Sequence, residues 1–186
     1  MNLYQYDRLY AALQFAAKAH DGQYRKQSNI PYITHPMMVG VFLQDANCSV
    51  DAIIAGYLHD TLEDTDVTED QIEKQFGSYV LELVKACSEP DKSKSWEERK
   101  TRTIDFLRNE ATVEVCYITC ADKLHNVRTI ITDYKKFQDD LWGRFNRGKQ
   151  HQKWYYTSLV EVLGEKIPNF PLYLLFKREV EAFFLD

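Results

Sequence analysis

Apolar side chains recur at helical spacing along nearly the whole chain, and this pattern constrains the fold more than any other feature. Residues 4–20, for example, place Leu9, Leu13 and Ala16 on one helical face. The 186 residues include only 7 glycines and 5 prolines, which is sparse for a protein rich in tight turns. We therefore predict an all-α fold, a helical bundle of about eight or nine helices.

Capping residues and chain breakers set the expected helix boundaries. Pro36 suits the first turn of a helix, and Ser49 and Thr68 are residue types that cap helix N-termini. The predicted helices cover residues 4–20, 36–46, 50–64, 68–77, 78–88, 95–109, 111–135, 149–164 and 172–184, with a loop at 138–148. We expect residues 1–186 to form one domain, in which 168–186 is a C-terminal helical extension that closes the bundle or contacts another subunit.

Charge and composition argue against several classes of protein. The net charge of −5 disfavours a dedicated nucleic-acid binder. The longest stretch without Asp, Glu, Lys or Arg, residues 27–44, contains prolines and amides and is not a membrane span. The N-terminus lacks the basic start and apolar block of a signal peptide, and the four cysteines have no CxxC spacing. We interpret the cysteines as free thiols and expect a cytoplasmic protein.

The segment HDTLEDT, residues 59–65, places a cluster of charge directly after an apolar helix. If the helix continues, His59 lies one turn from Glu63, and Asp60 lies one turn from Asp64. From residue 60 to residue 73 there are seven acidic residues and no basic one. Because close carboxylates repel one another, a cation among them is the economical explanation. Imidazole with carboxylates suits Mn²⁺, Fe²⁺, Zn²⁺ or Co²⁺.

Two other segments offer further metal ligands. In YITHP, His35 comes just before a proline-started helix and can project from a rigid turn. In ITCADKLHNVRT, Asp122 interrupts an apolar helix, and a buried carboxylate needs a partner. Lys123 is adjacent but points about 100° away on a helix, which makes a metal the better partner. The other His-Asp pair, at His20, is interpreted as helix capping and surface polarity.

The three blocks RKQSNIPYITHP, LHDTLEDT and ADKLHNVRT occur in an order and at separations that resemble the HD-domain phosphohydrolases. The resemblance is to the hydrolase domain of the Rel/Spo alarmone enzymes and to the free-standing small alarmone hydrolases, and it runs from about residue 10 to about residue 163. It implies an HD-domain helical bundle. It also implies hydrolysis of the 3′-pyrophosphate of guanosine tetra- or pentaphosphate. Because these residues are too few to include the synthetase domain that follows the hydrolase in the bifunctional enzymes, we do not expect synthesis of the alarmone.

The resemblance implies a role for each matching residue. The residues that match the four protein ligands of a single metal, usually Mn²⁺, are His35, His59, Asp60 and Asp122. Glu63 and Asp64 match the catalytic pair that positions and deprotonates the attacking water. The residues that match or adjoin the nucleotide site are Arg25, Lys26, Tyr32, Arg99, Lys100 and Asn126. We interpret the cluster of Trp154, Tyr155 and Tyr156 as packing on an amphipathic helix, and a nucleoside pocket is the alternative. We interpret His125 and His151 as surface or supporting residues.

The sequence is also compatible with other functions. HD-fold proteins also hydrolyse nucleoside monophosphates, cyclic nucleotides and the 2′-phosphate of NADPH, with the same metal chemistry and a different pocket. A regulator that binds a nucleotide without cleaving it is the third alternative, although such proteins would be expected to lose ligands or the Glu63–Asp64 pair. The expected partner is a small guanine nucleotide rather than nucleic acid or membrane, and the sequence leaves a homo-oligomer open.

Overall fold

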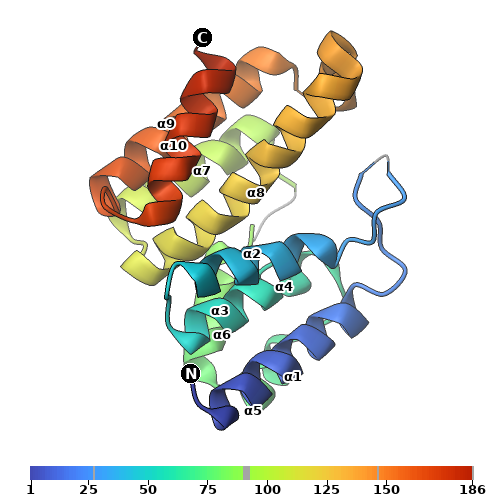
Figure 1. Cartoon of the computed structure of the whole chain (residues 1–186), viewed down its shortest axis with the longest axis vertical. Coiled ribbons are helices and arrows are strands. Elements are labelled where there is room, and N and C mark those ends of the chain that lie inside the picture. Colours follow the sequence, from blue (N-terminus) through green and yellow to red (C-terminus); the bar gives the residue numbers. More distant parts are fainter. Residues whose placement is uncertain (27, 90–92, 146, 186) are drawn as a thin grey trace.

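The computed structural model describes residues 1–26, 28–89, 93–145 and 147–185, and these residues form an all-α bundle (Figure 1). In the described part the only β-type pairing is an isolated antiparallel bridge between Tyr24 and Pro31. The helices are α1 (Leu3–Ala19), α2 (Thr34–Asp45), α3 (Val50–Leu58), α4 (Thr61–Asp64), α5 (Glu69–Phe76), α6 (Ser78–Cys87), α7 (Trp96–Asn109), α8 (Val113–Phe137), the 3₁₀ helix η1 (Gln138–Arg144), α9 (Lys149–Lys166) and α10 (Pro171–Phe184). The predicted fold class is confirmed.

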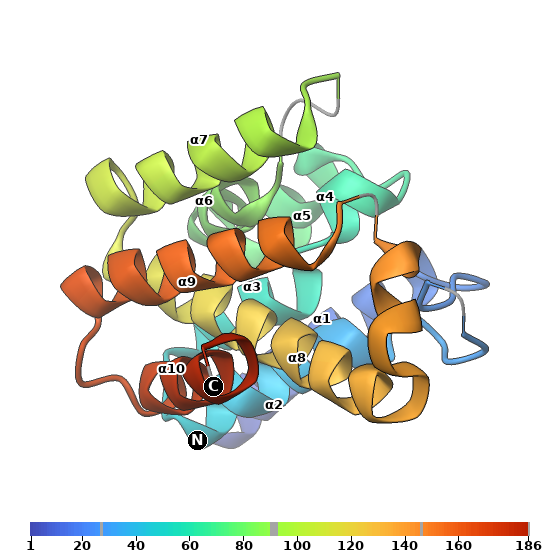
Figure 2. The same ribbon diagram turned by 90° about the horizontal axis from the view of Figure 1, so that it is seen from above.

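Helix α8 is the central element of the bundle. It packs against α2, α3 and α6 on one side and against α9 and α10 on the other, while α7 lies along α9. Figure 1 shows the first group and the second group at opposite ends of the view, with α8 between them, and Figure 2 shows α9 between α7 and α8. Polar residues on α8 can therefore reach both groups of helices.

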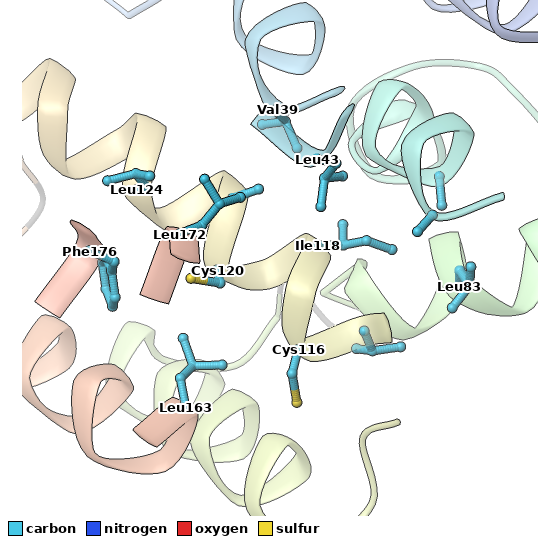
Figure 3. Packing of buried hydrophobic residues seen from close by; sticks show 14 of the residues in the cluster. Val39, Leu43, Leu83, Cys116, Ile118, Cys120, Leu124, Leu163, Leu172 and Phe176 are labelled. Atoms are coloured by element: carbon cyan, nitrogen blue, oxygen red, sulfur yellow. The ribbon is translucent and has the colours of Figure 1, made fainter. Parts of the chain in front are cut away.

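The core follows the predicted helical periodicity. Side chains from α2, α6, α8, α9 and α10 interdigitate around α8 (Figure 3). Cys116 and Cys120 are fully buried within it, and burial raises the pKa of both thiols. All four cysteines are free, as predicted. Within the described residues, no helix is long and apolar enough to cross a membrane.

Helices α2 and α3 approach each other closely because glycines lie at their contact. A Cβ on Gly40 would lie 2.1 Å from Cε1 of Tyr57, and one on Gly56 would lie 2.5 Å from Cδ1 of Leu43. Only a hydrogen atom fits at these positions, so the glycines fix the separation of the two helices. This separation matters because each helix carries a histidine of the site.

Three local predictions were wrong. The predicted helix 50–64 is interrupted at His59 and Asp60, because the hydroxyl of Thr61 donates to the carbonyl of Leu58 at 2.7 Å and ends α3 there. Helix α2 begins at Thr34, so His35 lies in its first turn rather than before it. The predicted loop 138–148 contains the 3₁₀ helix η1.

Candidate metal centre

Four polar side chains from three separate segments meet where α8 crosses α2 and α3. His35 Nε2 lies 3.6 Å from Asp60 Oδ2 and 3.2 Å from Asp122 Oδ1. His59 Nε2 lies 3.1 Å from Asp60 Oδ2 and 3.9 Å from Asp122 Oδ1. Both imidazoles and Asp122 are buried. The structure thus brings together all four residues that the sequence predicts as metal ligands.

The surroundings of His59 favour a positive charge in this cluster. Its Nδ1 lies 2.9 Å from the carbonyl oxygen of Gly56, which can only accept, so Nδ1 carries the proton. Its Nε2 is buried and makes no hydrogen bond within the described residues, although the carboxylate of Asp60 is close by. Burial alone would lower the pKa of His59, but Asp60 and Asp122 raise it to about 9.

The donor set fits a divalent cation. One ligand atom each from His35, His59 and Asp60 lies within 4.8 Å of the others, and this group could hold a metal ion. Asp122 adds a second carboxylate on the side of α8. Two neutral imidazole nitrogens and two carboxylates satisfy a borderline divalent ion, and the unpaired Nε2 of His59 is where such an ion would bind.

Neighbouring residues orient these ligands. The hydroxyl of Tyr32 donates to Asp60 Oδ2 at 2.6 Å, and the amide of Asn126 donates to Asp122 Oδ1 at 2.5 Å. The Nδ1 atoms of His35 and His125 lie 2.8 Å apart. Burial and His35 lower the pKa of His125 to about 4, so His125 is neutral and its Nδ1 can accept a hydrogen bond from the Nδ1–H of His35. Such contacts fix ring orientation and leave Nε2 of His35 free to bind a metal.

The structure corrects the prediction for Lys123. Its ammonium group lies 2.7 Å from Asp122 Oδ2, so the lysine is a partner of this carboxylate. A helical step of about 100° separates the two Cα–Cβ vectors, but the four-carbon stem folds back along the helix. Although burial would raise the pKa of Asp122, Lys123 and the histidines hold it well below its usual value. Asp122 therefore faces Lys123 with one oxygen and the histidines with the other.

Glu63 and Asp64 lie on the short helix α4 beside this cluster. The backbone N–H of Glu89 donates to Glu63 Oε2 at 3.1 Å, and burial raises the pKa of Glu63. The side-chain amide of Gln23 donates to the backbone carbonyl of Asp64 at 2.7 Å, and its oxygen lies 2.8 Å from Nδ1 of His20. His20 is buried, so its interpretation as a surface residue was wrong.

A cavity of about 700 Å³ opens beside the four-residue cluster. His59 and Asp122 form part of its wall, and its other lining residues include Glu89 just after α6, Arg99 on α7, Lys123 on α8 and Tyr155 on α9. The volume is within the range of small-molecule sites. Tyr155 and Tyr156 are buried and Trp154 is exposed. Tyr155 also lines this cavity, so burial fits the interpretation as packing for Tyr156, and the pocket alternative stays open for Tyr155.

The predicted nucleotide-binding residues fall into two groups. Arg25 donates to Asn126 at 3.1 Å, its guanidinium lies 5.6 Å from the ring centre of Tyr32, and Lys26 is exposed in the adjacent turn. Arg99 and Lys100 lie on α7, where both pair with Glu89. Arg25 and Lys26 are outside the lining of the 700 Å³ cavity. Sequence reasoning missed Gln23 and Glu89, which carry no local signal.

Comparison with known proteins places this geometry in a family. The Borreliella burgdorferi protein named guanosine-3′,5′-bis(diphosphate) 3′-pyrophosphohydrolase is 37% identical over 137 residues, which is 72% of this chain. The chain spans only about a fifth of that relative, 20% of its length. A Listeria monocytogenes EGD-e structure has 32% identity and a TM-score of 0.74, and covers 82% of this chain and 99% of its own.

A second solved structure covers nearly the whole chain. It is named as a metazoan ortholog of SpoT that hydrolyzes ppGpp, with 26% identity, a TM-score of 0.77, and 94% of each chain covered. The family model for the HD domain matches residues 12–145, which include the whole four-residue cluster. The two histidines and two aspartates of the cluster therefore lie within a recognised HD domain, and the chain belongs to the HD-domain family.

Proposed function

We propose that this chain is a metal-dependent phosphohydrolase that removes the 3′-pyrophosphate of guanosine tetra- or pentaphosphate, giving GDP or GTP and pyrophosphate. The observation that carries the proposal is the meeting of His35, His59, Asp60 and Asp122 beside a cavity of about 700 Å³. Curated relatives that share the HD region, and the metazoan structure, are named for this reaction.

The four ligand residues would hold one divalent ion, and Mn²⁺ is our first choice, with Fe²⁺, Co²⁺ and Zn²⁺ as alternatives. When bound, this ion would stabilise charge on the attacked phosphoryl group and lower the pKa of the attacking water. Lys123 holds Asp122 ionised, so the carboxylate is ready to bind.

Glu63 is our candidate for the general base, with Asp64 beside it. Burial raises the pKa of Glu63, which makes its carboxylate a stronger base than an exposed glutamate. It would take a proton from the water that attacks the 3′-linked phosphorus, and the bond from phosphorus to the 3′ oxygen would break. The N–H of Glu89 holds one oxygen of Glu63 in place.

The substrate's charge and base have separate candidate contacts. Arg25, Lys26, Tyr32 and Asn126 lie on the α1–α2 and α8 side, where the planar guanidinium of Arg25 can stack on a purine. Arg99 and Lys100 lie on the α7 side, where they can meet the distal phosphates. The substrate would span the metal centre between these two groups.

The test compares substrates on one preparation of metal-loaded protein. Guanosine tetraphosphate, NADPH and guanosine monophosphate are incubated with Mn²⁺, and release of pyrophosphate or phosphate is measured. We expect turnover of the tetraphosphate. Turnover of another compound with the tetraphosphate untouched would overturn the substrate assignment, and tight binding with no hydrolysis in any divalent metal would indicate a regulator.

Two variants separate the assigned roles. Asp60→Ala should lose metal and activity together, whereas Glu63→Gln should retain metal and lose about 10²-fold or more in kcat. Glu161→Gln on α9 is the matched control, since it removes one negative charge from an exposed pair with Arg108. Loss of metal from the Glu63 variant, measured by elemental analysis, would show that Glu63 is a ligand rather than the base.

A further inference from the structure

The side chain of Glu89 joins the two basic residues of α7. Its Oε2 pairs with Arg99 and its Oε1 pairs with Lys100. All three side chains are largely withdrawn from solvent, with exposed fractions of 17% for Glu89, 24% for Arg99 and 16% for Lys100. Burial would raise the pKa of Glu89, but Lys100, Lys123 and Arg99 together lower it, so the carboxylate is charged.

Glu89 lies at a point where the cavity and the metal centre meet. It lines the cavity together with Arg99 and Lys123, and the same cavity reaches His59 and Asp122. Its backbone N–H is bonded to Glu63, the candidate base. Any anion that enters the cavity toward Arg99 therefore meets the Glu89 carboxylate there.

The carboxylate of Glu89 does not provide a hydrogen-bond acceptor for every N–H group of Arg99 and Lys100. Arg99 Nε is buried and has no hydrogen-bond partner among the described residues. A carboxylate offers two oxygens, and both are already used by Arg99 and Lys100. A terminal phosphate offers three oxygens and more negative charge, so it can bind the same two cations and one further N–H.

We propose that Glu89 is a built-in competitor for this anion subsite: its carboxylate occupies the place of a phosphate between Arg99 and Lys100, and a phosphate group of the substrate must displace it. The proposal rests on the proposed function for the identity of the substrate, but the subsite itself does not. Displacement costs two ion pairs, so a singly charged anion gains little. A diphosphate, with more charge and more oxygens, recovers more of this cost than a monophosphate does.

Binding of inorganic pyrophosphate to protein kept metal-free with EDTA tests this without hydrolysis. Isothermal titration calorimetry at low salt compares the wild type with Glu89→Gln, which keeps the shape of the side chain and removes its charge. We expect pyrophosphate to bind the variant about tenfold more tightly, the equivalent of losing two partly buried ion pairs. Inorganic orthophosphate must displace the same carboxylate, so its affinity should rise by a similar factor.

Two further variants keep the result interpretable. Glu161→Gln makes the same change in net charge at an exposed pair outside the cavity lining and should leave pyrophosphate affinity within about twofold. Adding Arg99→Gln to Glu89→Gln should abolish the gain, because the freed cation is lost. Glu89→Ala should show the same gain as Glu89→Gln, and circular dichroism melts confirm that each protein is folded.

Equal or weaker pyrophosphate binding in a folded Glu89→Gln protein would overturn the proposal, because Glu89 would then organise the cations for the ligand instead of competing with it. A gain of equal size in Glu161→Gln would overturn it too, because the effect would then be general charge. If guanosine tetraphosphate proves not to be a substrate while the pyrophosphate result holds, the proposed function fails and the subsite remains.

Discussion

Gly40→Ala tests whether the α2–α3 contact sets the geometry of the metal centre. The added Cβ would lie 2.1, 2.5 and 2.7 Å from Cε1, Cδ1 and Cζ of Tyr57. Carbon atoms normally approach to about 3.5 Å, so the contact must open by roughly 1 Å or more. Tyr57 is 6% exposed, and its ring edge meets the new methyl group with little room to turn away. We expect the two helices to separate.

This shift is large on the scale of metal coordination. His35 is on α2 and His59 ends α3, so separation of the helices moves the two ligand nitrogens apart. Metal–ligand bonds tolerate about 0.2 Å, and a displacement of about 1 Å should weaken Mn²⁺ binding about 10- to 100-fold. Overpacking costs about 1–3 kcal/mol, and the gain of about 1 kcal/mol from replacing a helical glycine offsets part of it.

The assay combines two measurements on EDTA-stripped protein. Calorimetric titration with Mn²⁺ gives affinity, and circular dichroism melts give Tm, which should fall by about 0–8 °C. Gly164→Ala is the matched control, because its Cβ would lie 2.4 Å from the hydroxyl oxygen of Tyr173, at the contact of α9 with α10. That variant should be destabilised while its Mn²⁺ affinity stays within about twofold.

The reasoning would be refuted by a Gly40→Ala protein that binds Mn²⁺ as tightly as the wild type. It would equally be refuted if Gly164→Ala weakened Mn²⁺ binding to the same degree, because the site would then respond to general loosening. Gly40→Ala combined with Tyr57→Leu should recover part of the affinity, since the smaller side chain relieves the contact that the argument depends on.

Three other predictions follow from the site. Because burial raises the pKa of Glu63, its carboxylate becomes protonated at a higher pH than an exposed glutamate, whose pKa is 4.5. We therefore expect kcat to fall as the pH drops through a value above 4.5. A pH–rate profile in which kcat falls only at or below pH 4.5 would contradict this. Lys123→Met should cost the metal-free protein about 3 kcal/mol in urea unfolding, with part recovered by Mn²⁺, because it leaves Asp122 buried without its cation; equal stability would contradict it. Tyr32→Phe removes the hydroxyl that donates to Asp60 and should weaken Mn²⁺ binding about tenfold by calorimetry, and unchanged affinity would show that the contact does not orient the ligand.

Local sequence signals predicted most of the helices because the signals themselves are local. Thr68, which was predicted as a helix cap, forms a capping box, and α5 begins directly after it. Ser95 forms a second capping box at the start of α7. The interruption at His59 and Asp60 was missed because it depends on a threonine hydroxyl that competes with the helical N–H for a carbonyl. Helical periodicity carries no information about that competition.

The meeting of the four polar residues could be predicted in part, because burying a polar side chain without a partner costs free energy. Asp122 interrupts an apolar helix and His35 directly precedes the apolar segment that starts at Pro36, and both features are visible in the sequence. Glu89 and Gln23 were not anticipated, since each contacts a residue at least 26 positions away in an otherwise ordinary polar setting. For His125 a supporting position was one of the two interpretations, but its contact with His35, 90 positions away, could not be predicted. Only the packing of helices can reveal such contacts.

The charges of the site also bear on how the protein folds. Asp60 and Asp122 approach the same two imidazoles, and the only compensation within the described cluster is Lys123 and a proton on His59. A divalent ion would replace that proton and bind all four side chains at once, so metal binding should add directly to the free energy of unfolding. Because the ligands come from α2, the α3–α4 junction and α8, the ion would join α8 to the helices on one side of it. The negative charges of Asp60 and Asp122 therefore lie where a bound cation would stabilise the fold most. The cavity beside them extends along α7 and is open to an anionic substrate.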